Sequence, residues 1–65
     1  MERIEFIMRL EEAKKELPTS IVPVFIKKFK EYDKFRNRVT SVVQGRSQDE
    51  DVLKKLESLA NYFKS

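Results

Sequence analysis

The sequence predicts an all-α protein: a compact bundle of about four helices in a single helical domain, residues 1–65. Three observations indicate this class. Apolar residues recur at steps of three and four along most of the chain, which places them on one face of a helix. No stretch shows sustained strand alternation flanked by turns. Two prolines and one glycine separate the apolar segments, at places where helices begin or end.

Length and composition limit what such a bundle can do. A chain of 65 residues buries only about 60% of its unfolded surface, so helix packing must stabilise it, and a partner subunit would extend that packing. The absence of Cys and His excludes disulfides, the usual zinc sites and His-based acid–base catalysis. One glycine cannot form a glycine-rich phosphate loop. We therefore expect no metal, no cofactor and no enzymatic activity.

The chain carries no signal for a membrane. No apolar run approaches the roughly 20 residues that a membrane span needs, and the acidic start, residues 1–5, is unlike a secretory signal. A helix bundle lying on a membrane surface is the least favoured reading, because the basic segment is short and lacks Trp. We expect a cytoplasmic protein.

The first helix is expected over residues 2–17. Its packing face, stepping by three and four, comprises Phe6, Ile7, Leu10, Ala13 and Leu17, widened by Ile4 and Met8. Glu11 and Lys15 form an i,i+4 pair in the favourable order. Pro18 ends the helix, because the residue before a proline is pushed toward extended geometry. This helix is expected to pack against the core, with a dimerisation surface as the alternative.

The second helix is short and basic. Thr19 and Ser20 are both able to cap its start, and Pro23 is tolerated in the first turn. Residues 21–26 are apolar and β-branched enough for a strand, but Pro23 argues against a central one. Helical steps of three and one link the apolar residues Val22, Phe25, Ile26 and Phe29.

The third helix, residues 34–44, organises the rest of the chain. Asp33 is the expected N-cap, and Gly45, the only glycine, is expected to end the helix with a positive φ. On a helical wheel one apolar stripe contains Phe35, Val39, Val42 and Val43. The opposite face carries short or planar hydrogen-bonding groups and no acid, which suits the reading of base edges: Arg36, Asn37, Thr40, Ser41 and Gln44.

The fourth helix has clear start signals. Ser47 to Glu50 matches a capping box, and Asp49, Glu50 and Asp51 place negative charge at the positive end of the helix dipole. Helical spacing continues to the end through Val52, Leu53, Leu56, Leu59, Ala60 and Phe63. This acidic start and apolar face indicate a structural role.

Positive charge is concentrated in the middle of the chain. Residues 1–17 hold four Lys/Arg and five Asp/Glu, a net of −1, and residues 47–65 hold three and four, also −1. Residues 18–46 hold seven and two, a net of +5, and they include the third helix. Such a bias is what a phosphate-facing surface needs, although a basic face that serves only solubility has the same composition.

The run from Arg36 to Arg46, followed by an acidic helix start, resembles a known pattern. It is similar to the recognition helix and next helix of small helix-turn-helix DNA-binding proteins of the phage-repressor (Cro/lambda-repressor-like) type. The resemblance implies a helix-turn-helix at about residues 19–45, with helix 34–44 in the major groove of double-stranded DNA and a homodimer on two half-sites. Phosphate contacts would come from Lys27, Lys28, Lys30, Lys34, Arg38 and Arg46, and the base-facing residues would be Arg36, Asn37, Thr40, Ser41 and Gln44.

The chain departs from this family before Arg36. The family's turn commonly reads Ala-x-x-x-Gly, whereas Phe29 and Asp33 occupy those places here, so either the turn is longer or its register differs. The competing hypothesis is a small helical protein-interaction module, an inhibitor or adaptor, whose basic face docks an acidic partner.

Overall fold

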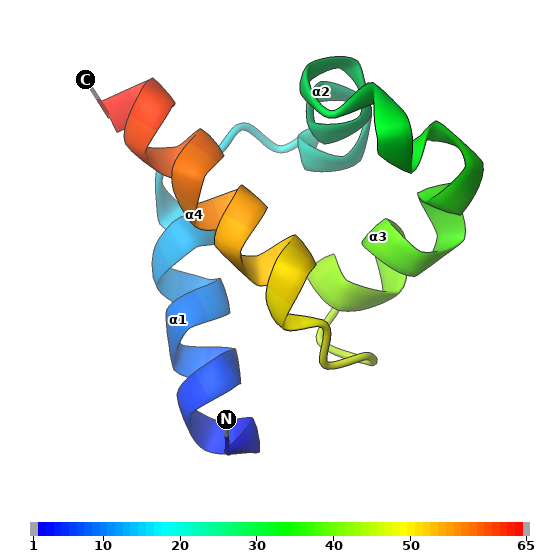
Figure 1. Ribbon diagram of the computed structural model, residues 1–65. Coiled ribbons are helices and arrows are strands. Elements are labelled where there is room, and N and C mark those ends of the chain that lie inside the picture. Colours follow the sequence, from blue (N-terminus) through cyan, green and yellow to red (C-terminus); the bar gives the residue numbers. More distant parts are fainter. Residues whose placement is uncertain (1, 65) are drawn as a thin grey trace.

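The fold is built around one long C-terminal helix. The computed structural model describes residues 2–64, and within them α4 (Glu50–Lys64) packs against α1 (Arg3–Lys15) on one side (Figure 1). On the other side the chain curves through α2 (Ile21–Lys28), the 3-10 helix η1 (Lys30–Phe35) and α3 (Arg36–Val43). No strand occurs in this range, which confirms the all-α class, and residues 21–26 lie in α2.

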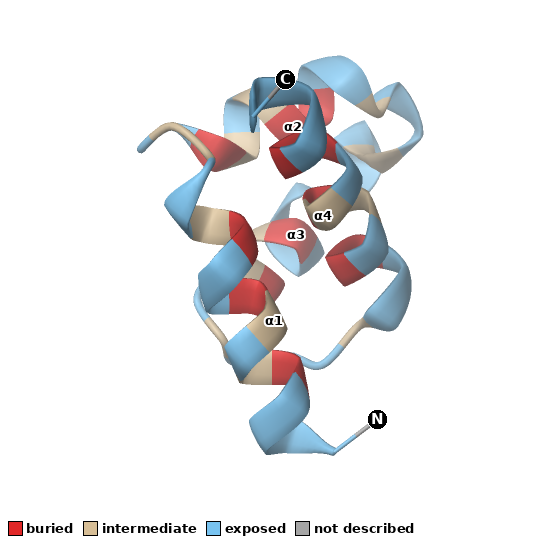
Figure 2. Ribbon diagram, turned by 90° about the vertical axis from the view of Figure 1, so that its left-hand side faces the viewer, coloured by how far each residue is buried: buried red, intermediate tan, exposed pale blue. Residues whose placement is uncertain are grey.

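The core is apolar and is shared by all four α-helices. Figure 2 shows their buried segments turned toward a common interior. The α4 face that the spacing predicted is buried except for Phe63, and Phe6 and Leu10 of α1 and Phe25 of α2 are buried too. Val39 and Val42 of α3 are fully buried. No charged or polar residue is buried among residues 2–64, so hydrophobic packing alone fills the centre.

Some apolar residues that we expected in the core lie outside it. Ile4 and Met8 are 73% and 63% exposed, because they lie on the side of α1 opposite to its buried stripe. Phe35 is 50% exposed, because it belongs to η1, whose three-residue turns rotate it away from Val39. Phe63 is 45% exposed in the last turn of α4. The expected packing of these four side chains was wrong.

The first two helices begin and end near the predicted points. Helix α1 ends at Lys15, shortly before Pro18, and Pro23 lies in the first turn of α2. Ser20 occupies the N-cap position of α2 without a side-chain cap bond. The expected Glu11–Lys15 pair does not form; Lys15 instead bonds Glu12 at 3.1 Å, and Glu11 lies 3.7 Å from Lys14.

Gly45 ends α3 as predicted. Its φ is +79°, and its amide donates to the carbonyl of Val42 at 3.0 Å. The amide of Arg46 donates to the carbonyl of Ser41 at 2.8 Å. These two bonds form a Schellman motif, in which the residue after the helix must adopt the left-handed conformation that glycine tolerates.

Two helix starts differ from the expectation. The Asp33 cap was wrong, because Asp33 lies inside η1 and the N-cap position of α3 is Phe35, without a side-chain cap bond. At α4 the capping box of Ser47 was also wrong. One carboxylate oxygen of Asp49, Oδ1, accepts the amides of Asp51 and Val52 at 3.0 and 3.3 Å, so the helix begins two residues later.

Candidate nucleic-acid interface

Helix α3 shows the polar face that the wheel predicted. Asn37, Gln44 and Arg36 are exposed, and Thr40 and Ser41 are partly exposed. The opposite side of the same helix carries Val39 and Val42, which are fully buried against the core. Because a helix cannot turn about its axis without exposing these valines, the core holds the amide side chains outward.

An ordered connection holds α3 against α2. Residues 29–35 join the two helices, which is longer than the three or four residues usual in a helix-turn-helix. The Phe25 ring lies 4.9 Å from Phe29 and 5.3 Å from Tyr32, measured between centroids. Lys55 of α4 lies over the rings of Phe29 and Tyr32 at 6.0 and 5.6 Å. This aromatic packing, rather than a short glycine turn, positions the start of α3.

The side chains of the polar face differ in whether a contact within the protein already uses their polar groups. The Thr40 hydroxyl donates to the Arg36 carbonyl at 3.0 Å, so its proton is used within the helix while its oxygen still accepts. Asn37 and Gln44 present amides, which pair with the edge of an adenine by one donor and one acceptor. Arg36 lies 3.9 Å from Asp33, a pair exposed on both sides and therefore weak.

The six expected phosphate residues are all exposed, and two of them, Lys28 and Arg38, contact other side chains of the protein. The ammonium of Lys28 lies 4.8 Å from the centroid of Tyr62, so this side chain is directed toward the C-terminal part of α4. Nε of Arg38 lies 2.8 Å from Oδ2 of Asp49, which forms an ion pair with it. The other four are exposed on α2, on η1 and beyond the end of α3: Lys27, Lys30, Lys34 and Arg46.

Sequence reasoning missed the role of Asp49 beside this face. It treated Asp49 only as a charge at the start of α4, whereas the side chain reaches Arg38. A hollow of about 410 Å³ adjoins the pair and includes Tyr32, Phe35 and Lys55 in its lining. No local signal in the sequence reports this proximity, because α3 and α4 meet only in the folded chain.

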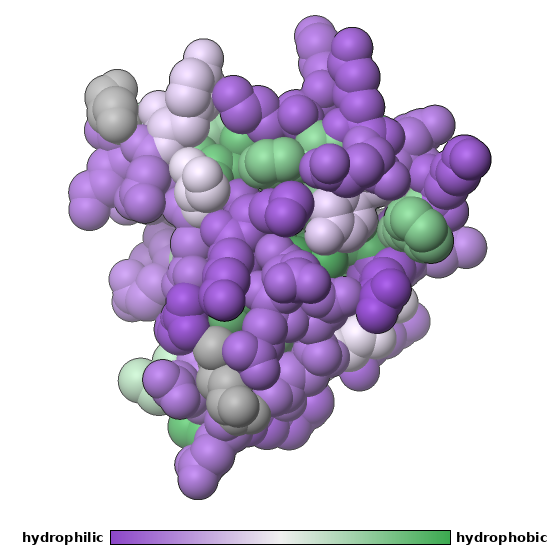
Figure 3. All heavy atoms as spheres, in the orientation of Figure 1, coloured by the Kyte–Doolittle hydropathy of each residue, from purple (hydrophilic) through white to green (hydrophobic). Residues whose placement is uncertain are grey.

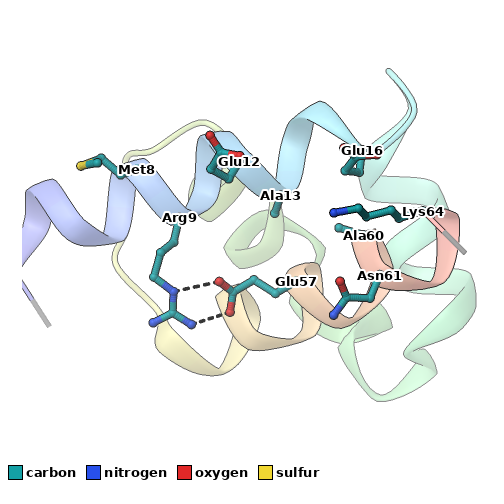
Figure 4. A pocket seen from close by; sticks show the side chains of 9 residues that line it. All are labelled: Met8, Arg9, Glu12, Ala13, Glu16, Glu57, Ala60, Asn61 and Lys64. Atoms are coloured by element: carbon teal, nitrogen blue, oxygen red, sulfur yellow. Dashed lines mark hydrogen bonds and ion pairs between the residues drawn. The ribbon is translucent and has the colours of Figure 1, made fainter.

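A second hollow, of about 540 Å³, lies between α1 and α4 (Figure 4). Arg9 reaches across from α1 to Glu57 on α4, with Nε 2.8 Å from Oε2 and a second bond from Nη2 to Oε1. The hydrogen bond to Glu57 raises the pKa of the Arg9 guanidinium above its ordinary value. Small side chains, Ala13 and Ala60, line the hollow, and the ion pair crosses it. This arrangement joins two helices.

The side of the molecule seen in Figure 3 is mostly hydrophilic, with small separated hydrophobic areas. Within the described range no group of three or more acidic side chains is arranged to hold a metal ion. None of the described helices is both long and apolar enough to cross a bilayer. No protein-family model matches the chain, and the comparisons with curated proteins and with solved structures found no match.

Proposed function

We propose that this protein binds double-stranded DNA sequence-specifically, as a small transcriptional regulator that places α3 in the major groove; this helix covers residues 36–43 of the expected helix 34–44, because residues 34 and 35 belong to η1. The observation that carries the proposal is the orientation of α3: its valines are fully buried while Asn37 and Gln44 are exposed. The net charge of +5 over residues 18–46 also supports the proposal, because phosphate contacts supply a large share of the affinity of such proteins.

The dimensions suit this use. An α-helix with its side chains is about 10–12 Å across, and the major groove of B-DNA is about 12 Å wide. Base contacts are assigned to Arg36, Asn37, Thr40, Ser41 and Gln44. Lys34 and Arg46, exposed just before and just after α3, would contact phosphates on either side of the groove.

A homodimer on a near-palindromic site is the form we propose for the complex. Modules that read a few base pairs gain specificity by binding two half-sites about one helical turn apart. The dimer predicts a preferred site with two-fold symmetry.

The experiment is a selection from random duplexes, followed by gel shifts of the selected duplex and a scrambled one at two salt concentrations. We expect a preferred sequence and a steep loss of affinity as salt rises. A chain that binds no duplex at either salt concentration would contradict the proposal. If the protein then captures an acidic protein partner through the same basic residues, the interaction-module alternative is correct.

A further inference from the structure

Asp49 connects the two helices that meet beside the proposed DNA-binding face. Its side chain is only 16% exposed, although it precedes an exposed helix start, whereas the side chain of its partner Arg38 is 62% exposed. Both carboxylate oxygens are used: Oδ1 accepts the amides of Asp51 and Val52, and Oδ2 lies 2.8 Å from Nε of Arg38 in an ion pair. The backbone of α4 therefore holds this carboxylate in place.

The ion pair at Nε restrains Arg38 in a particular way. A guanidinium is planar, so an attraction at Nε favours orientations of the whole group that leave the two Nη nitrogens at its outer end. A free arginine on a helix surface samples many rotamers and loses that freedom when it binds. Because Asp49 holds it, the Arg38 side chain has already lost part of its rotamer freedom before DNA binds.

We propose that Asp49 is a positioning residue for DNA binding, which holds the Arg38 guanidinium so that its Nη edge meets a backbone phosphate. This inference rests on the proposed DNA-binding function. It assigns Asp49 a second role besides capping α4, and so gives a function to an acidic side chain beside a surface proposed to meet phosphates.

Charge repulsion and positioning predict opposite changes in DNA affinity when the charge of Asp49 is removed. A carboxylate near DNA repels phosphates, so removing its charge should strengthen binding if charge alone matters. If Asp49 positions Arg38, removing the charge should weaken binding. Asp49→Asn separates the two effects, because its Oδ1 still caps α4 while its neutral amide no longer attracts the guanidinium of Arg38.

The matched control is Asp51→Asn. It removes the same charge two residues away, from an exposed side chain whose contacts in the described chain do not include Arg38. On the duplex selected by the wild-type protein, we expect Asp49→Asn to weaken binding about two- to tenfold and Asp51→Asn to leave it unchanged or strengthen it. Thermal unfolding shows whether each variant is folded, and Asp49→Ser, another good cap, replaces Asp49→Asn if that variant is not.

Salt titrations and a double variant complete the test. Affinity falls as salt rises, and Arg38→Ala should make the slope of log affinity against log salt shallower by about one. Asp49→Asn should make it shallower too. The double variant should bind no more weakly than Arg38→Ala alone. Tighter binding by Asp49→Asn, or additive losses in the double variant, would overturn the positioning role. Failure of the wild-type protein to bind any duplex would instead remove the DNA-binding function itself.

Discussion

Nζ of Lys14 on α1 donates a hydrogen bond to the backbone carbonyl of Val43, the last residue of α3, at 3.2 Å and across 29 positions of sequence. Arg3 makes a similar bond to the carbonyl of Gly45 at 3.1 Å. The last carbonyls of a helix lack partners within it and carry its negative dipole end. Two cations of α1 therefore help to hold the C-terminal end of the proposed recognition helix.

The first prediction concerns this bond. Lys14→Met keeps an unbranched apolar chain but removes the ammonium, so the Val43 carbonyl loses a charged donor. We expect the free energy of unfolding to fall by about 0.5–1 kcal/mol, measured by urea unfolding followed by circular dichroism. Lys15→Met is the control, because Lys15 is more exposed and bonds only its neighbour Glu12 in the described chain. Equal losses in the two variants would show that the bond to α3 is unimportant.

The second prediction concerns Gly45. Gly45→Ala places a Cβ at a φ of +79° and brings it to 3.4 Å from Cδ1 of Ile7. The contact is tolerable, so backbone strain dominates, and we expect a loss of about 1–2 kcal/mol in stability. Gly45→Asn should lose less, because asparagine adopts the left-handed region more readily. Thermal melts of the three proteins give the comparison, and an alanine variant as stable as wild type would contradict it.

The third prediction concerns the Arg9–Glu57 pair between α1 and α4. Glu57→Gln should lower stability by less than Gly45→Ala does, because both side chains are about one-third exposed and solvent screens the pair. The charge-swapped variant Arg9→Glu with Glu57→Arg should recover part of what either single reversal loses. A swap that is no more stable than the single reversals would show that the pair contributes nothing specific.

The same pair also predicts a pH response. The pKa of Arg9 is raised in the folded protein, so its contribution is fully present below the ordinary arginine pKa and is lost only as pH rises beyond it. Stability attributable to Arg9 should therefore be flat between about pH 6 and pH 9. The measurement compares the effect of Arg9→Met on the unfolding midpoint at both pH values, and a smaller effect at the higher pH would contradict it.

The fourth prediction separates base reading from phosphate binding. Asn37→Ala or Gln44→Ala should reduce the preference for the selected sequence over a scrambled duplex, by about 1–3 kcal/mol for a lost bidentate contact. Lys34→Ala should weaken both duplexes alike and lower the salt slope by about one. Competition binding with the two duplexes gives both numbers, and a uniform effect of Asn37→Ala would argue against base contact.

Several features depended only on local sequence. Apolar periodicity predicted the helices. It placed Val39 and Val42 on the buried side of α3 and Asn37 and Gln44 on the exposed side. The lone glycine marked the end of that helix, because few other residues adopt a positive φ. Within one helix, side-chain direction follows from the period, so no long-range information was needed.

Other features were decided only when the helices met. The exposure of Phe35 follows from the 3-10 geometry of η1. In the same segment, Phe29 and Tyr32 pack on the ring of Phe25. Similarly, the outward position of Ile4 and Met8 depends on which side of α1 faces α4. Apolar character alone does not choose between several adjacent faces of a short helix, because that choice depends on the neighbour's position.

By itself, the sequence determined the helical class, the rotation of α3 and its end at Gly45, since each follows from residues within a turn or two of one another. Only the tertiary structure decided that Asp49 would hold Arg38 and that Lys14 would reach Val43. Those bonds join residues on different elements, and their formation depends on the distances between helix axes, which are set by core packing and not by local pattern.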